Sequence, residues 1–306
     1  MNATTLPITI PEYLEQLRAA LRGADPAMIQ DALYDAEEYL RSELAANFAG
    51  RSSRSEAEVI AAVAGSYGAP EEVAEIYRDT EVTVNRALRA PAAPKRKSVW
   101  GQFFGVIVDP RTYGALFYML LSLATGIVYF TVVTTGLSLS LGLLILIIGI
   151  PMLVLFLGLI RVLSLVEGRI VEVLLGERMP RRPLYTQKGK GWLERIKEIF
   201  TDVRTWTAML YFLLMLPLGT AYFTIAVTGL SVAVSMIVLP VGLLFGFGSH
   251  LFVDGVDLVY TSEPWTFPLV VLGGVLLLFV TLHLARAIGK LHGLLAKHLL
   301  VRNPVV

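Results

Sequence analysis

Residues 109–149 read DPRTYGALFYMLLSLATGIVYFTVVTTGLSLSLGLLILIIG. After Arg111 this run carries no charge, and about 20 such apolar residues are enough for a helix to cross a bilayer. At an offset of 93, residues 202–242 read DVRTWTAMLYFLLMLPLGTAYFTIAVTGLSVAVSMIVLPVG and align with the first run without a gap. Polar residues match as well as apolar ones, beginning with Asp109 on Asp202. An apolar bias alone would match only residues such as Leu and Val, so the alignment indicates an internal duplication.

Four segments have the length and apolar character of membrane-spanning helices, namely 115–135, 139–163, 208–229 and 266–285. The Thr-Gly-Leu-Ser motifs within the matched runs are expected to be turns, in which glycine ends one helix and serine caps the next. We therefore expect an all-α protein in which a small soluble helical bundle precedes a polytopic membrane domain built of two parallel repeats. The repeats are expected at about 100–165 and 192–252, with a further span at 266–285.

Lysine and arginine set the expected orientation. They concentrate in 89–111, in 161–206 and in a basic amphipathic tail, 286–306, which is expected to lie on the membrane surface. The positive-inside rule then places both termini in the cytoplasm, with the chain in a cytoplasmic membrane. Five complete spans would separate the termini. We therefore favour four spans plus a re-entrant segment at 232–252, which contains Pro240, over the alternative of five spans.

Residues 1–90, called the head below, have the opposite charge. They contain 15 acidic and 8 basic residues, whereas the remainder of the chain contains 10 acidic and 18 basic residues. This acidity argues against direct binding of nucleic acid, because phosphate contacts need a basic surface. Capping residues, prolines and apolar spacing predict four short helices, and residues 91–99 form a basic, proline-rich linker. Contact between the acidic head and the basic membrane part would make the head an intramolecular switch.

The head contains Tyr13-Leu14-x-x-Leu17-x-x-x-Leu21, Glu58-Val59-Ile60 and Gly68-x-Pro70-Glu71-Glu72-Val73-Ala74-x-x-Tyr77. Over roughly residues 10–80 these motifs resemble the HAAS-type signalling domain. Such domains occur in bacterial membrane proteins often encoded beside PadR-type transcription regulators. The resemblance implies a cytoplasmic protein partner, for which a PadR-type regulator is one candidate. The candidate partner-binding residues are Pro70, Glu71, Glu72 and Tyr77.

Two sets of polar residues in the membrane part are candidates for a functional role. The first set would line a polar ligand pocket, unless its members only build turns: Tyr129, Phe130, Thr131, Thr135, Ser138, Tyr222, Phe223, Thr224, Thr228 and Ser231. The second set would couple the spans to the cytoplasm, unless its members only extend from the membrane into water. It comprises Arg161, Glu167, Arg169, Glu172, Asp202 and Arg204.

Chemistry of the enzymatic kind is not expected. The chain has no cysteine, and it lacks the phosphate-binding, zinc-protease, hydrolase and calcium-loop motifs. His250, Asp254 and Asp257 share one face of a helix and are weak metal candidates. Three such residues arise easily by chance, and acids are common in external loops. We therefore expect a protein that is not an enzyme and that needs neither a metal nor a cofactor.

The membrane part contains Gly158-Leu-Ile-Arg161, Glu167-x-Arg169, Asp202-x-Arg204-Thr205-Trp206 and Leu216-Pro217-Leu218-Gly219. Over roughly residues 100–290 these residues resemble the bacterial "putative sensor" membrane domain. That domain stands at the head of some actinobacterial histidine kinases and in stand-alone membrane proteins. No kinase core follows before Val306, so we expect the output to pass through the head or a separate partner.

The two resemblances together imply a bacterial membrane sensor. It would detect a membrane-associated or hydrophobic signal and relay that signal through the head to a protein partner. Membrane lipids are expected to contact the chain, and a homo-oligomer is compatible with the sequence. A transporter or permease component is one alternative, because parallel repeats with broken segments also occur in transporters. A scaffold that does not respond to any signal is the other.

Overall fold

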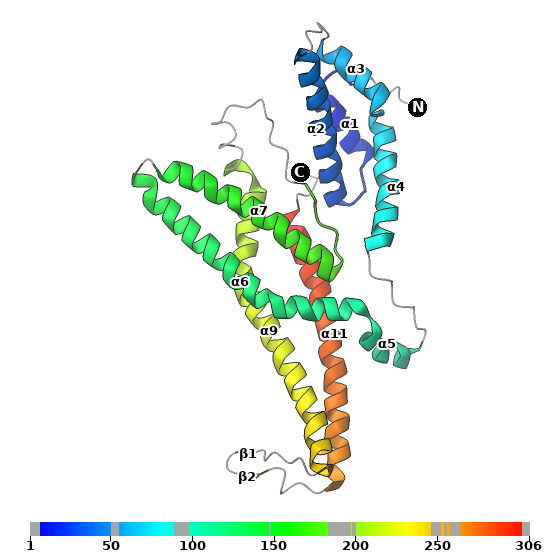
Figure 1. Cartoon of the computed structure of the whole chain (residues 1–306), viewed down its shortest axis with the longest axis vertical. Coiled ribbons are helices and arrows are strands. Elements are labelled where there is room, and N and C mark those ends of the chain that lie inside the picture. Colours follow the sequence, from blue (N-terminus) through cyan, green and yellow to red (C-terminus); the bar gives the residue numbers. More distant parts are fainter. Residues whose placement is uncertain are drawn as a thin grey trace.

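The structure, a computed structural model, describes residues 7–49, 55–88, 98–146, 148–182, 197, 200–245, 252–253, 256–257 and 264–301. Helices of the head lie at one end of the molecule (Figure 1). The described residues from 98 to 301, called the membrane body below, make up the rest. The last described helix, which ends at Leu300, has its C-terminal end beside the head. At the opposite end, the two-residue strands β1 (Phe252–Val253) and β2 (Val256–Asp257) pair antiparallel.

The head consists of α1 (Ile10–Ala20), α2 (Pro26–Ala49), α3 (Glu56–Ser66) and α4 (Pro70–Leu88). Its helices begin at residues that cap helices well. The Asp25 carboxylate accepts the N–H of Ala27 at 2.9 Å. Ser55 and Glu58 form a capping box, in which each side chain accepts the backbone N–H of the other residue. The apolar faces meet in one core, whose largest fully buried side chains are Tyr13, Leu17, Leu21, Leu40 and Ile60.

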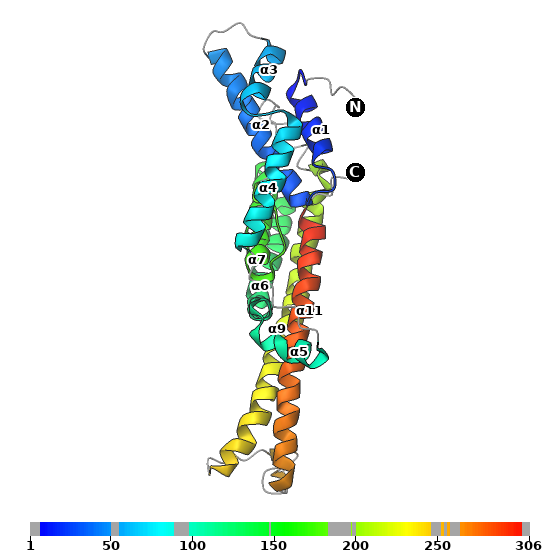
Figure 2. The same cartoon turned by 90° about the vertical axis from the view of Figure 1, so that its right-hand side faces the viewer.

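The membrane body consists of two helical hairpins that cross (Figure 1). A short entry, α5 (Val99–Gly105) and η1 (Val106–Val108), leads into α6 (Pro110–Gly142), and η2 (Leu143–Ile145) connects α6 to α7 (Gly149–Leu175). The second hairpin pairs α9 (Val203–Leu244) with α11 (Phe267–Leu300), which η3 (Pro264–Thr266) precedes. Figure 2 shows this longer hairpin reaching well beyond α6 and α7 at the end opposite the head.

Four helices of the described chain are long and apolar enough to cross a membrane: Pro110–Ile145, Gly149–Leu175, Val203–Leu243 and Phe267–Leu300. Many of their large apolar side chains are exposed on the outside of the body, as expected of surfaces that face lipid rather than water. The protein is therefore a multi-pass membrane protein of helical type. The preference for four spans over five agrees with these helices.

The expected turns at Thr-Gly-Leu-Ser are wrong, because both motifs lie inside helices. Gly136 belongs to α6 and Gly229 to α9. Neither adopts a left-handed conformation; both permit a close approach of the neighbouring helix instead. A Cβ atom on Gly136 would lie 2.2 Å from the ring of Phe156, and one on Gly229 would lie 2.7 Å from Oγ1 of Thr281. These glycines allow close packing of helices, and the sequence motif alone does not distinguish that role from a turn.

The expected re-entrant segment is also wrong. The described part of 232–252 continues α9 without a break to Leu244, although Pro217 and Pro240 lie inside that helix. Proline is tolerated in membrane helices because neighbouring groups satisfy the carbonyl that it leaves free. The helix that pairs with α9 is therefore α11, so the second helix pair ends near residue 300 rather than at 252. The basic tail does not form a separate helix either, since α11 extends through Leu300 and packs against the body.

The two hairpins meet most closely where α6 crosses α9. A Cβ atom on Gly126 would lie 2.5 Å from the carbonyl oxygen of Met215, and one on Gly219 would lie 2.2 Å from that of Ser122. The contact is reciprocal, because the offset of 93 relates Gly126 to Gly219 and Ser122 to Met215. Only glycine permits backbones to approach so closely. The crossing fixes the surfaces that surround the site described next.

Candidate functional site: a buried polar centre and the docked head

A cluster of polar side chains lies where the four spanning helices meet. This polar centre comprises Tyr118 and Tyr129 of α6, Glu167 of α7, Tyr211 and Tyr222 of α9, and His292 of α11. Oε1 of Glu167 accepts the hydroxyl hydrogens of Tyr118 at 2.7 Å and of Tyr211 at 2.8 Å. Oε2 of Glu167 accepts that of Tyr129 at 2.9 Å. The Glu167 side chain is fully buried, so three tyrosines replace the water that it has lost.

His292 contacts the same two central tyrosines from the other side. Its Nε2 lies 2.6 Å from the hydroxyl oxygen of Tyr118 and 2.8 Å from that of Tyr211. Its Nδ1 lies 3.3 Å from the hydroxyl oxygen of Tyr222. Each central hydroxyl therefore bridges a carboxylate oxygen and an imidazole nitrogen. An ionisable residue buried among membrane helices is costly, so it marks a functional site more often than a structural one.

The arrangement has the same internal correspondence as the helix crossing. An offset of 93 relates Tyr118 to Tyr211 and Tyr129 to Tyr222, and an offset of 125 relates Glu167 to His292. The outer tyrosine on each side bonds the ionisable residue of that side. The two central tyrosines lie against each other, with their hydroxyl oxygens 3.4 Å apart. The centre thus has two equivalent halves that differ in chemistry, one acidic and one basic.

Two ion pairs connect the hairpins, and they obey the same offsets. Arg161 of α7 lies 3.1 Å from Asp202, which caps α9. Arg286 of α11 lies 3.1 Å from Asp109, which caps α6, although these two atoms are not aligned for a hydrogen bond. Each hairpin therefore holds the first turn of the other. A shift of one hairpin against the other must disturb both pairs and the polar centre together.

The head docks on the same two helices that complete the polar centre. After Gly176 ends α7 in a left-handed conformation (φ 74°), the chain turns into residues 177–182, which lie against the head. There Arg178 pairs with Asp31 at 3.2 Å and also with Glu81. On α11, Lys297 pairs with Asp25 at 2.5 Å. Acidic residues of the head thus meet basic residues of the body.

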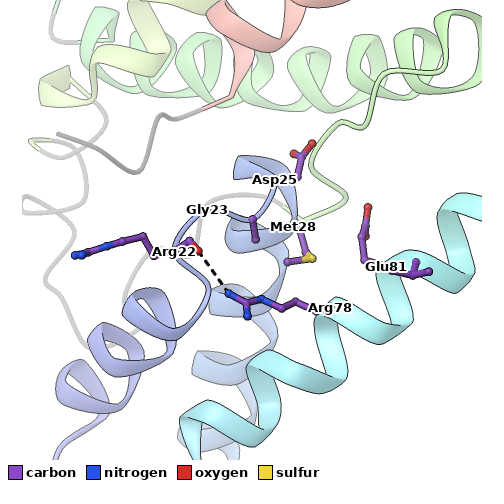
Figure 3. Close-up of a pocket in the computed structure, with 8 residues that line it drawn as sticks. Arg22, Gly23, Asp25, Met28, Arg78 and Glu81 are labelled. Carbon is purple, nitrogen blue, oxygen red and sulfur yellow. Dashed lines mark hydrogen bonds between the residues drawn. The ribbon is translucent and has the colours of Figure 1, made fainter. Parts of the chain in front are cut away.

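Apolar packing supports this docking. Ala27, at the start of α2, is fully buried in the same cluster as Met179, Ala296 and Leu300 of the body. The pocket of Figure 3, with a volume of about 340 Å³, lies between the start of α2 and α4, beside this contact of the head with the body. Its lining residues Asp25 and Glu81 point from the head toward the body. The core of the body therefore continues into the head at the start of α2.

Burial dominates the electrostatics of the docking contact. It raises the pKa of the Asp31 carboxyl, although the N–H groups of Arg181 and Arg182 and the charge of Arg178 act in the opposite direction. Burial also lowers the pKa of the Arg178 guanidinium, against the attraction of Asp31. Both groups are thus shifted toward their neutral forms. Such a pair gives a specific contact with little net stabilisation.

Comparison with known proteins identifies the family of this fold. The family described as "Putative sensor" matches residues 118–300, which include every residue of the polar centre. The chain belongs to this Sensor family. No curated protein and no solved structure is significantly similar to the chain. The family match begins after the head, so the resemblance of the head to a HAAS-type domain stays a prediction.

In this member of the Sensor family, two of the ten predicted ligand-pocket residues reach the polar centre. These are Tyr129 and Tyr222. The hydroxyl-bearing residues of the set that lie on the outer surface of α6 and α9 are Thr131, Thr135, Ser138, Thr224, Thr228 and Ser231. Phe130 and Phe223 are half-buried. A ligand-binding role for the set stays a prediction.

The six predicted coupling residues lie on α7 and at the start of α9. Glu167 does not extend into water, because it is fully buried in the polar centre. Arg161 and Asp202 form the ion pair described above. The remaining three also bond: Arg169 to Glu172, Glu172 to Arg181, and Arg204 to Gln30 of the head. Their role in coupling stays a prediction, but these contacts connect the spans to the head.

The predicted partner and metal residues have less defined surroundings. Glu71 and Glu72 are exposed at the start of α4, and Pro70 is buried. The Tyr77 hydroxyl donates to Asp35 at 3.0 Å. His250 and Asp254 lie outside the described residues, and Asp257 belongs to β2. Among the described residues, no group of acids and histidines could hold a metal ion.

Sequence reasoning missed His292, the basic half of the polar centre. One signal could have found it, because Arg161 and Glu167-Gly168 match Arg286 and His292-Gly293 at the offset of 125. The alignment at 93 stops at residue 242 and does not reach this second helix. The connection between α9 and α11 is longer than the one between α6 and α7, so the offset rises from 93 to 125. An alignment at a single offset therefore does not show the match of α7 with α11.

Cysteine cross-linking can verify the docked head. The native chain has no cysteine, so a pair at Asp25→Cys and Lys297→Cys reacts with a bis-maleimide of short spacer without competition. A maleimide is used because a disulfide needs Cα atoms within about 7 Å, whereas this contact is made by the end of a long lysine side chain. We expect most of the protein to form the internal cross-link, measured as a mobility shift on denaturing gels. The control pairs Asp25→Cys with Lys290→Cys, two turns away or about 10 Å along the same helix. Equal yields for the two pairs would contradict the docked arrangement.

Proposed function

We propose that this Sensor-family protein is a bacterial membrane sensor that relays its signal through the head. The signal would be a lipid, a hydrophobic compound or a change in membrane packing. One observation carries the proposal: both helices that supply the ionisable residues of the polar centre continue into contacts with the head. Glu167 precedes Arg178 by less than a dozen residues, and His292 precedes Lys297 by five. Movement at the centre would therefore reach both docking contacts.

The relay rests on a duplicated pair of helices, α6–α7 and α9–α11. The reciprocal glycine contacts, the two cap ion pairs and the halves of the polar centre support this duplication, because all obey the same two offsets. Helix packing in membranes depends on such close contacts and interhelical hydrogen bonds. A ligand that binds one crossing angle better than another would shift the population of the two arrangements. The head would then dock or detach.

The head is proposed to face the cytoplasm and to act as a HAAS-type signalling domain. The basic residues near the head-side ends of the spans favour that side by the positive-inside rule. A cytoplasmic protein, with a PadR-type regulator as the first candidate, would bind the head in one of its two states. We further propose that the protein does so without catalysing a reaction.

Affinity capture tests the relay. Full-length protein in detergent is compared with the variant Arg178→Ala, which removes the buried base that docks the head. We expect a cytoplasmic signalling protein to be captured with different yields by the two, and a strain lacking residues 1–90 to reproduce the phenotype of the full deletion. Wild-type signalling without the head would overturn the proposal. Flux of a substrate through purified protein in liposomes would favour a transporter instead.

A further inference from the structure

Residues 177–182, Glu-Arg-Met-Pro-Arg-Arg, are held by the head as a peptide is held by a recognition domain. The segment is not helical, so its backbone groups are open to partners outside a helix. Asp31 of α2 accepts the N–H of Arg181 at 2.7 Å and that of Arg182 at 2.9 Å, both on Oδ1. Gln30 donates from Nε2 to the carbonyl oxygen of Arg182 at 2.8 Å. Contacts with the backbone in both directions fix the register of the segment.

Two arginine side chains of the segment are recognised as well. Arg178 enters between α2 and α4, pairs with Asp31 and Glu81, and keeps only 9% of its side chain exposed. Arg182 pairs with Asp35 at 3.0 Å, and its guanidinium carbon lies 5.8 Å from the centre of the Tyr34 ring. Planar guanidinium groups suit carboxylates and aromatic faces in a way that lysine does not. The head thus binds two arginine side chains, Arg178 and Arg182, that are separated by three residues.

We propose that this face of α2 and α4 is a binding cleft for an extended, arginine-bearing peptide segment of the output partner. The cleft is defined by Gln30, Asp31, Tyr34, Asp35 and Glu81. Residues 177–182 occupy it in cis, and a segment of the partner with the same chemistry competes for it. The inference rests on the proposed function and names the chemistry of its partner. Signal-driven movement of α7 would withdraw the segment of its own chain and free the cleft.

Residues 177–182 compete strongly with any free peptide, because they belong to the same chain as the head. A segment attached to its own head has an effective concentration on the order of millimolar, so a free peptide of ordinary affinity cannot displace it. Removal of the two arginine side chains in cis weakens the internal ligand and leaves the cleft intact. The free peptide then meets an open site. This difference between wild type and variant is what distinguishes a shared cleft from a general attraction of bases to an acidic head.

Binding of a synthetic peptide tests the proposal in the full-length protein. The probe is fluorescent Glu-Arg-Met-Pro-Arg-Arg, and the protein is the double variant Arg178→Ala, Arg182→Ala in detergent, checked for a single size-exclusion peak. We expect saturable binding by fluorescence anisotropy, with an affinity at least tenfold higher than for wild type. Adding Asp31→Asn to the double variant should reduce that affinity at least tenfold. A scrambled peptide of the same composition, Arg-Arg-Met-Arg-Glu-Pro, in which no two arginines are four residues apart, controls for charge.

Equal binding of the native and scrambled peptides, or no binding to the double variant, would overturn the cleft. If the double variant does not fold, the single variant Arg182→Ala, which removes a side chain that is 52% exposed, serves in its place. It should bind the native peptide more tightly than wild type does, and the scrambled peptide should show no such gain. Neither assay needs a stimulus. Their failure would therefore refute the cleft while the head-deletion phenotype still decides the sensor function.

Discussion

Replacement of Glu167 by alanine should lower the unfolding temperature of the purified protein by roughly 10 °C. The change removes the acceptor of three tyrosine hydroxyls in a fully buried site. An unsatisfied buried polar group costs about 1–3 kcal/mol, and 1 kcal/mol shifts the transition of a domain of this size by about 2–4 °C. The measurement is thermal unfolding in detergent, followed by the loss of the monodisperse size-exclusion peak.

Glu167→Gln provides the matched comparison. The amide keeps one acceptor oxygen and nearly the shape of the carboxylic acid, so Tyr118 and Tyr211 can still donate to it. We expect a loss of no more than a few degrees. If the glutamine variant were as unstable as the alanine variant, the charge rather than the hydrogen bonds would hold the centre together. If both were as stable as wild type, the centre would contribute nothing to the fold.

Replacement of Gly219 by alanine should destabilise the protein by about 3 kcal/mol, the upper end of the range for overpacked contacts. The added methyl group would lie 2.2 Å from the carbonyl oxygen of Ser122. A backbone atom of a packed helix cannot move aside as the end of a side chain can. The hairpins must therefore separate at their crossing. The midpoint of denaturant-induced unfolding in mixed micelles measures this loss.

Gly158→Ala is the control for that change. Gly158 lies in a spanning helix as Gly219 does, but nothing lies within 4 Å of the position of its Cβ atom. Alanine there should leave stability unchanged or raise it, because alanine is the better helix former by about 1 kcal/mol. Gly126→Ala, the reciprocal contact, should resemble Gly219→Ala. Equal effects at 158 and 219 would show that the crossing is not as close as described.

Much of this fold can be predicted from the sequence, because its main determinants are local or periodic. Apolar length identifies the spans, and the acidic head with its capping residues predicts α1 to α4. The matched Asp109 and Asp202 mark the residues at which α6 and α9 begin. Apolar length reflects the surrounding solvent, and helix caps involve backbone groups that are close in sequence. Both can therefore be recognised without knowledge of tertiary contacts.

The errors concern glycine, proline and long-range pairing. Gly136 looks like the end of a helix and Pro240 like a break, yet both lie within continuous helices. Whether such a glycine or proline ends a helix depends on which helix packs against it. That neighbour cannot be known from sequence when the connection between α9 and α11 differs in length from the connection between α6 and α7. For the same reason Glu167 could be singled out but its counterpart His292 could not. The hydroxyl-bearing residues of the matched motifs lie on the outer surface of α6 and α9, whereas Gly136 and Gly229 of the same motifs pack against neighbouring helices.

The most direct test of the relay combines the polar centre with the docked head. The cross-link between Asp25→Cys and Lys297→Cys is measured in protein that carries Glu167→Gln, a change expected to keep the fold. The amide keeps the bonds from the central tyrosines but places an NH₂ group where Oε2 of Glu167 accepts the Tyr129 hydroxyl. We expect this change to rearrange the α6–α7 half of the polar centre and so to shift α7 relative to α11. We predict that the cross-linking yield falls to less than half of that with native Glu167, while Gly158→Ala leaves it unchanged. An unaltered yield in the glutamine variant would contradict coupling between the centre and the head.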